Sequence, residues 1–163
     1  MIRKAVPSDL SQVEQCFTEL LKHQQTHTAY TSWRLNVYPT RITAEKALAT
    51  GSLYVMEQDG EIAASMIAGP NQPEKFRDID WRYPAQENEV FVLHLLCVRP
   101  SRSRRGIGQA MVQHAVQEAR RLHYRVVRLD TGEQNLPARA LYTKQGFECA
   151  GLRHPFLYFE LKV

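Results

Sequence analysis

The segment from Asn135 to Phe147 constrains the fold more than any other stretch of this chain. It reads N-x-x-A-x-x-x-Y-x-x-x-G-F and predicts a short helix, on which Ala138 and Tyr142 share one face because they are four residues apart. Asn135 suits the N-cap of this helix, and Gly146 suits the position after its last turn. The segment therefore predicts a tyrosine phenol on a rigid element, where it could protonate a departing thiolate.

The upstream segment from Leu95 to Gly108 predicts a strand, a turn and the start of a helix. Its apolar run ends at Pro100, a basic turn follows, and a G-x-G pattern formed by Gly106 and Gly108 opens the helix. Glycines leave the backbone N–H groups exposed, and a helix N-terminus adds partial positive charge. These features together indicate a binding site for a pyrophosphate group.

Hydrophobic periodicity along the rest of the chain predicts one α/β domain over residues 1–163, with a mixed central β-sheet flanked by helices. Asp59-Gly60 between two alternating runs predicts a β-hairpin, and the apolar residues 89–98 predict a strand buried on both faces. The segment 69–88, rich in proline and charge, predicts an irregular connection. The expected order is β-α-α-β-β-β-α-β-α-β-β, with strands near 1–6, 52–58, 61–68, 89–98, 124–130, 147–152 and 156–162 and helices near 10–21, 43–50, 107–122 and 135–145.

Composition limits the classes of protein to which the chain can belong. No window approaches the ~18–20 apolar residues that span a bilayer, and the first residues lack the apolar core of a signal peptide, so we expect no membrane partner and a cytoplasmic location. The net charge of +4 is modest, and no aromatic residues interleave with the basic cluster near the glycines. A phosphate site is therefore favoured over a nucleic-acid partner.

The cysteines and histidines point to neither a disulfide framework nor a metal site. Cys16, Cys97 and Cys149 are scattered and odd in number, and we expect each to be a small buried residue. His23 and His27 are four apart, a spacing that exposed polar helix faces also show by chance. We therefore expect no metal.

The two motif segments together resemble the GNAT superfamily of acyl-CoA-dependent N-acyltransferases. The segment that begins at Asn135 matches one signature of that family without departure, and the expected element order is the family's order. The other signature is a strand that ends in V-x-P, followed by R/Q-x-x-G-x-G/A. Ser103 stands where the family has Arg or Gln, with Arg102 and Arg104 on either side. The residues that match this signature are Val98, Pro100, Gly106 and Gly108.

The resemblance implies an N-acetyltransferase that moves an acetyl group from acetyl-CoA, as co-substrate and without a metal, to a primary amine by direct attack in a ternary complex. It also implies that a backbone N–H near Leu96 polarises the thioester carbonyl. By the same resemblance, the residues expected to bind acetyl-CoA are Leu96, Cys97, Val98, Ser103, Arg104, Arg105, Gly106, Ile107, Gly108 and Asn135.

Transfer to an amine requires a group that removes a proton, because an ammonium with a pKa near ~10.4 is mostly protonated at neutral pH. His94 is the favoured general base, because it precedes Leu96 by two residues and so shares its face of the strand. Tyr142 is the expected general acid. The rival bases are Asp130, Glu89 and Glu133, and His154 lies nearer a turn, where we expect it to face water.

The acceptor pocket is expected from residues 33–38, the segment 69–88 and the C-terminal hairpin. Its acids could attract a cationic amine and its aromatic residues could stack on the apolar part, which favours a small cationic amine over a peptide N-terminus or a lysine side chain. The acids are Asp78, Asp80, Glu87 and Glu89, and the aromatic residues are Trp33, Trp81 and Tyr83.

Three alternatives remain open at the level of sequence. The chain could be a non-catalytic acyl-CoA-binding or sensing module, a protein or peptide N-acetyltransferase, or a basic adaptor for RNA. A homodimer through the C-terminal strands is also plausible, because the run 156–161 is long, aromatic and suited to a sheet edge, although a core strand would have the same pattern.

Overall fold

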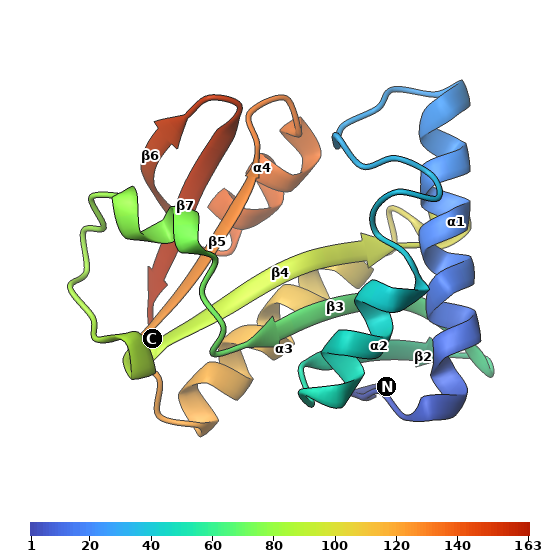
Figure 1. Ribbon diagram of the computed structural model, residues 1–163, viewed down its shortest axis with the longest axis horizontal. Helices are drawn as coiled ribbons and strands as arrows, with labels where there is room; N and C mark the ends of the chain where they lie inside the picture. Colours follow the sequence, from blue (N-terminus) through green and yellow to red (C-terminus); the bar gives the residue numbers. More distant parts are fainter. The chain divides into compact units, whose positions relative to one another are not determined.

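The computed structural model describes residues 1–163 and contains a seven-stranded mixed β-sheet and four α-helices (Figure 1). Hydrogen bonding orders the strands β1-β2-β3-β4-β5-β7-β6. The order along the chain is the expected one, so the predicted mixed α/β fold is confirmed. The strands are β1 (Ile2–Lys4), β2 (Leu53–Gln58), β3 (Glu61–Gly69), β4 (Val90–Val98), β5 (Val126–Gly132), β6 (Glu148–Arg153) and β7 (Phe156–Lys162), and the helices are α1 (Leu10–Thr26), α2 (Arg41–Ala49), α3 (Ile107–Arg121) and α4 (Leu136–Lys144).

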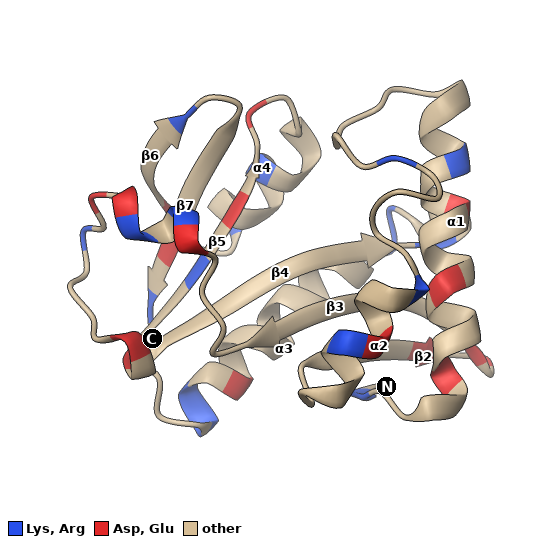
Figure 2. Ribbon diagram, in the orientation of Figure 1, with Lys and Arg blue, Asp and Glu red and all other residues tan.

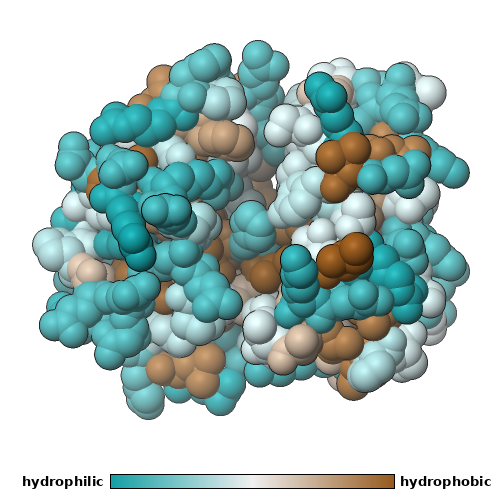
Figure 3. Space-filling view, in the orientation of Figure 1, coloured by the Kyte–Doolittle hydropathy of each residue, from teal (hydrophilic) through white to brown (hydrophobic).

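The chain divides into two compact units. The first comprises Met1–Ile67 and Leu95–Met111, and the second comprises Ala68–His94 and Val112–Val163. Strand β4 passes from the second unit to the first after His94. No helix is both long and apolar enough to cross a membrane. The face of the molecule in Figure 3 is mostly hydrophilic, with its hydrophobic residues in small separate patches.

The first unit is built on the antiparallel strands β1, β2 and β3. The predicted Asp59-Gly60 turn joins β2 and β3, and both residues have positive φ (53° and 77°), as the favoured two-residue hairpin turn requires. Helix α2 begins at Arg41, slightly before the predicted start, because the backbone N–H of Thr40 is satisfied by the hydroxyl of Thr43 at 3.1 Å. The boundaries of the other elements differ from the prediction by similarly small margins.

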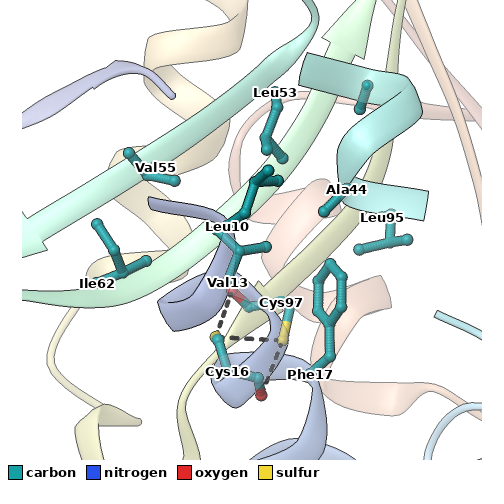
Figure 4. Packing of buried hydrophobic residues seen from close by; sticks show 11 residues of the cluster. Leu10, Val13, Cys16, Phe17, Ala44, Leu53, Val55, Ile62, Leu95 and Cys97 are labelled. Carbon is teal, nitrogen blue, oxygen red and sulfur yellow. Dashed lines mark hydrogen bonds between the residues drawn. The ribbon is translucent and has the colours of Figure 1, made fainter. Parts of the chain in front are cut away.

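The core of the first unit joins α1, α2 and the strands (Figure 4). The apolar face of α1 is buried there, and its side chains pack with Leu53, Val55 and Ile62 of the strands. The thiols of Cys16 and Cys97 lie 3.5 Å apart in this core, both free and buried as predicted. The prediction is wrong for Cys149, which is exposed because β6 is the outermost strand of its end of the sheet.

The second unit contains the remaining strands and α4. Strand β7 pairs with β5 on one side and β6 on the other, so the aromatic run 156–161 is an interior strand. The edge-strand interpretation of this run is therefore wrong, and β6 forms the edge instead. Helix α4 lies beside β5 and β7 in Figure 1 and packs through Tyr142, whose ring centroid is 6.1 Å from that of Phe159.

A buried charged pair fastens the segment 69–88 to the sheet of the second unit. Glu160 on β7 is fully buried, and its carboxylate accepts the backbone N–H groups of Arg82 (2.6 Å) and Tyr83 (3.4 Å). Arg128 stands opposite Glu160 in the β5–β7 register, donates to the carbonyl of Tyr83 at 2.9 Å and stacks 4.4 Å over the ring of Trp81. The loop that ends before β4 is therefore held by charge-assisted hydrogen bonds.

We expect Glu160→Leu to lower the free energy of unfolding by about 3–5 kcal/mol, because it leaves Arg128 buried without its opposite charge. The matched control is Glu148→Leu. Glu148 faces Glu160 across β6 and β7, but its side chain is 43% exposed, so its loss should cost about 1 kcal/mol or less. Urea unfolding followed by circular dichroism measures both variants, and equal midpoints for the two would contradict the anchoring role.

Candidate active site

The parallel strands β4 and β5 stop pairing partway along their length. Their register runs from Val90 opposite Val126 to Val92 opposite Arg128 and goes no further, although β5 continues to Gly132. Two more residues in the same register would set His94 opposite Asp130. The strands therefore separate just before the level of His94 on β4 and Asp130 on β5.

A strained residue follows His94 directly. Leu95 has a φ of +48°, in the left-handed region that residues with a Cβ atom rarely adopt. Such a conformation costs roughly 1–2 kcal/mol and is kept only where the surrounding structure enforces it. Here the buried side chain of Leu95 packs into the core of the first unit (Figure 4), which holds the irregular backbone in place.

His94 is partly buried, and its surroundings keep the imidazole neutral. Burial lowers its pKa below the ordinary 6.5, the Asp130 carboxylate raises it, and the nearby Lys75 ammonium lowers it again. The net direction is downward, so His94 is unprotonated at neutral pH and can accept a proton. This is the state that a general base requires.

Tyr142 occupies α4 as the sequence predicts. The side-chain carbonyl of Asn135 accepts the backbone N–H of Ala138 at 3.2 Å and caps the helix, and Gly146 follows it with a φ of +88°. The Tyr142 ring is buried against Phe147, and burial raises its pKa well above the usual value, with a further contribution from Asp130. The phenol is therefore protonated at neutral pH and can act as a proton donor.

The carboxylate of Asp130 acts electrostatically on both His94 and Tyr142. It also pairs with Lys75, which the sequence did not indicate. The Nζ atom of Lys75 lies 2.6 Å from the Asp130 carboxylate and 4.0 Å from the ring centroid of Phe156. Strand β5, which contains Arg128 and Asp130, carries both acidic and basic bands in Figure 2. No local pattern links residues 75 and 130, and only the β5–β7 register brings the aromatic side chains of β7 to this position.

The two other rival bases are occupied by structural contacts. Glu89 accepts the backbone N–H of Gln86 and pairs with Arg125, and both contacts lower the pKa of its carboxyl group. Glu133 pairs with His154, which is 80% exposed and faces solvent as expected. Neither Glu89 nor Glu133 stands at the point where β4 and β5 separate.

The basic turn of the first unit is held by a network around Arg99. Its guanidinium donates to the carbonyl of Ile62 at 2.6 Å and to the carboxylate of Glu19 at 3.0 Å. Glu19 also accepts the backbone N–H of Ser101 at 3.0 Å, which fixes the first residues of the turn. These contacts fix the backbone between the end of β4 and the turn that contains Gly106.

The glycine motif follows this network. Gly106 has a φ of +74°, a conformation that favours glycine. A Cβ atom built there would meet nothing within 4 Å, so the backbone conformation rather than a steric clash explains the glycine. Arg102 is committed to Glu61 and Asp59, whereas Arg104 and Arg105 are exposed and form no ion pair. The guanidinium available beside Ser103 is therefore that of Arg104, not Arg102.

The other residues expected to bind acetyl-CoA differ in exposure. Leu96 and Val98 are partly exposed and alternate with the buried Leu95 and Cys97. The Cys97 side chain lies in the core, so only its backbone could face a ligand. Ile107 is buried, Gly108 is partly exposed and Ser103 is exposed. These positions are compatible with a site made mainly of backbone groups.

The aromatic residues expected in the acceptor pocket have structural partners instead. Trp33 packs on the core of the first unit beside Tyr38, and Trp81 stacks on Arg128. The Tyr83 hydroxyl donates to Glu148 at 2.7 Å, and this contact raises the pKa of Tyr83. A separate groove of about 600 Å³ beside α4 is lined by Arg139, Lys144, Cys149 and other residues of α4, β6 and β7, and it includes none of His94, Asp130 and Tyr142.

Asn135 provides a test that separates capping from cofactor binding. Asn135→Asp keeps an oxygen that accepts the Ala138 N–H, so the unfolding midpoint should change little, whereas Asn135→Ala should cost about 1 kcal/mol. If the amide NH₂ also donates to acetyl-CoA, both variants should raise the Kd for acetyl-CoA several-fold, as measured by calorimetry. Unchanged affinity in Asn135→Asp would limit Asn135 to capping.

Comparison with known proteins identifies the family. The family model described as the acetyltransferase (GNAT) family matches residues 14–147. An uncharacterized N-acetyltransferase of Methanocaldococcus jannaschii is 34% identical over 71 residues, which are 44% of this chain and 31% of that protein. The chain thus matches less than a third of the length of this curated relative.

Solved structures share the fold over the whole chain. An acetyltransferase of the GNAT family from Streptococcus agalactiae superposes with a TM-score of 0.78 at 19% identity, covering 100% of this chain and 95% of that one. One from Listeria monocytogenes gives 0.77 at 18% identity, with 100% and 94% covered. The ribosomal-protein-S18-alanine N-acetyltransferase from Escherichia coli gives 0.71 at 18% identity, with 100% and 93% covered.

The chain belongs to the GNAT acetyltransferase family. This family uses acetyl-CoA as co-substrate together with an acceptor.

Proposed function

We propose that residues 1–163 form one N-acetyltransferase domain that moves an acetyl group from acetyl-CoA to a primary amine by direct attack. His94 acts as the general base and Tyr142 as the general acid. The observation that carries the proposal is the end of β4–β5 pairing after Val92 and Arg128, with His94 and Asp130 at the point of separation. The neutral imidazole of His94 can accept a proton and the protonated phenol of Tyr142 can donate one. The carboxylate of Asp130 raises the pKa of both groups.

The reaction begins with the acceptor as an ammonium ion, which has no lone pair for attack. His94 accepts one of its protons, and the resulting amine attacks the carbonyl carbon of the thioester. As the C–N bond forms, the nitrogen becomes positively charged and releases its second proton to solvent. The C–S bond then breaks, and the departing thiolate takes a proton from the Tyr142 hydroxyl. The buried Tyr142 phenolate recovers a proton from solvent, and imidazolium at His94 releases its own.

The residues that would hold acetyl-CoA lie on β4 and at the start of α3. Backbone N–H groups of the turn around Gly106 and the helix start at Ile107 suit the pyrophosphate, and Arg104 supplies a free positive charge. The partly exposed residues Leu96 and Val98 would pair through their backbone with the pantetheine arm. Acetyl-CoA supplies the activated acetyl group.

A small cationic amine is the favoured acceptor. The proposal is supported by the acidic and aromatic groups around Lys75 rather than by the loop acids that the sequence suggested. A protein N-terminus is a second candidate, because two neighbours of similar fold are named as ribosomal-protein alanine N-acetyltransferases.

The test is thiol release from acetyl-CoA in the presence of a panel of acceptors: polyamines, amino acids, aminoglycosides, aryl-alkylamines and peptides. We expect turnover with small amines that carry positive charge, with the N-acetyl product identified by mass spectrometry. Turnover restricted to peptides with a free N-terminus would replace the small-amine acceptor by a protein. Absence of turnover across the panel, with acetyl-CoA bound, would contradict the proposed reaction for these acceptor classes.

A further inference from the structure

We infer that Asp130, Phe156 and Tyr158 form a subsite for the ammonium group of the acceptor, and that the side chain of Lys75 occupies this subsite as an internal competitor. The inference rests on the proposed function and adds to it the class of substrate: an unhindered primary amine that binds as a cation. It also assigns a role to Lys75 that the reaction itself does not require.

The geometry around Lys75 Nζ is that of an ammonium-binding site. The nitrogen lies 2.6 Å from a carboxylate oxygen of Asp130, 4.0 Å from the ring centroid of Phe156 and 6.0 Å from that of Tyr158. Asp130 and Tyr158 are paired residues of β5 and β7, so the carboxylate and an aromatic ring are fixed on adjacent strands. Carboxylates and aromatic faces are the two groups that attract an alkylammonium most strongly in proteins.

The subsite selects for charge because its carboxylate is poorly solvated. The Asp130 side chain is only 9% exposed, so losing its cation would leave a charge that water hydrates poorly. A neutral molecule that displaced Lys75 would impose this cost. An ammonium ion that displaced Lys75 would form a new ion pair with Asp130 in place of the lost one. A primary ammonium resembles the end of a lysine side chain most closely.

Lys75 is placed so that it can leave. Its side chain is 41% exposed, and Asp130 is its only ion-pair partner. The short helical turn that carries it, Glu74–Asp78, is anchored by the buried ring of Phe76, so the backbone can stay fixed while the flexible side chain moves to solvent. Displacement therefore requires rotation of one side chain rather than a rearrangement of the loop.

The subsite also lies within electrostatic range of the proposed proton acceptor. The Lys75 ammonium and the Asp130 carboxylate both act electrostatically on His94, and Asp130 also acts on Tyr142. An acceptor ammonium in the place of Lys75 Nζ would therefore be held close to the group that removes its proton. Binding and deprotonation would share one location.

The inference is tested by titrating n-butylammonium into the protein without acetyl-CoA, with 1-butanol as a neutral control of similar shape. The indole N–H of Trp81, whose ring centroid is 6.2 Å from that of Tyr158, reports binding in a ¹⁵N–¹H spectrum. Lys75→Met removes the competing charge and keeps an apolar chain against Phe156, so we expect at least tenfold tighter binding of n-butylammonium than in the wild type. Asp130→Asn added to Lys75→Met should abolish this binding.

Wild-type protein provides a measurement that needs no substitution. The ε-carbon resonance of Lys75 should shift toward that of a solvent-exposed lysine as n-butylammonium is added, and 1-butanol should leave it unchanged. If Lys75→Met does not fold, Lys75→Gln replaces it in the titration. Equal affinity in wild type and the Lys75 variant, or binding of 1-butanol as tight as that of n-butylammonium, would overturn the inference.

These results are separable from the fate of the proposed function, because binding is measured without acetyl transfer. Tight, charge-selective binding in a protein that acetylates no amine would retain the subsite and overturn the reaction. Acetylation of small amines together with unchanged n-butylammonium affinity in the Lys75 variant would retain the reaction and overturn the subsite.

Discussion

His94→Gln should lower kcat/KM for the amine by roughly 10²- to 10⁴-fold, the usual contribution of a positioned general base. Glutamine keeps the approximate size and hydrogen-bonding capacity of histidine but cannot take up a proton at neutral pH. Because the substitution should affect only proton transfer, the Kd for acetyl-CoA should change by less than about threefold. This corresponds to a smaller free-energy change than the loss of one typical hydrogen bond. Steady-state kinetics and calorimetry measure the two quantities separately.

The pH dependence gives the same residue a second signature. In the proposed mechanism the neutral form of His94 is the active one. Its pKa lies below 6.5, so kcat/KM should fall as the pH decreases through that lowered pKa and show no loss from this group at pH 7. Lys75 lowers the pKa of His94, so Lys75→Met should move this acidic limb to higher pH. Asp130 raises it, so Asp130→Asn should move the limb to lower pH.

His114→Gln is the matched control, because His114 on α3 is also partly buried and its pKa is also lowered by burial. It stands outside the separated strands, and its replacement should leave kcat/KM and the acidic limb within twofold of wild type, about 0.4 kcal/mol. An acidic limb that persists unchanged in His94→Gln would exclude His94 as the base and return Asp130 to consideration.

Tyr142→Phe should lower kcat by on the order of 10²-fold or more, because the leaving thiolate must then take its proton from water. The phenylalanine ring keeps the contacts with Phe147 and Phe159, so the unfolding midpoint should remain close to that of wild type. The raised pKa of Tyr142 means that the wild-type enzyme loses no activity through ionisation of this phenol up to its ordinary value near 10.

Tyr124→Phe provides the matched control for loss of a phenol hydroxyl. Tyr124 is also in the second unit and packs on Phe91, with ring centroids 5.1 Å apart, and no proton-transfer role is assigned to it. We expect kcat within about twofold of wild type for this variant. Wild-type turnover in Tyr142→Phe would show that the thiolate is protonated by another group.

Most of the fold could be predicted from local sequence signals. Helix α4 was predicted correctly because Asn135 and Gly146 are effective helix boundaries, and the hairpin at Asp59-Gly60 was predicted because that dipeptide favours positive φ. The edge or interior position of β7 could not be predicted, because strand order depends on contacts distant in sequence. Its aromatic pattern fits both positions.

The site was only partly accessible to sequence analysis. Tyr142 belongs to a motif with fixed spacing, and His94 precedes Leu96 by two residues on the predicted strand, so the elements that carry both residues could be predicted. The Lys75–Asp130 pair could not, because it joins a short turn in an irregular segment to a strand that follows α3. The engagement of Trp81 with Arg128, and of Glu89 with Arg125, also depends on tertiary contacts. Sequence therefore located His94 and Tyr142 on their elements but could not reveal the contact between Lys75 and Asp130.

The most direct test of the account is a single-turnover experiment in which enzyme with bound acetyl-CoA is mixed with an accepted amine, and thiol and N-acetyl product are followed together. Direct transfer predicts that both appear at the same rate and in equal amounts, and that neither appears before the amine is added. Thiol released in a burst without amine, with an acetylated enzyme detected by mass spectrometry, would contradict direct attack and require a covalent intermediate.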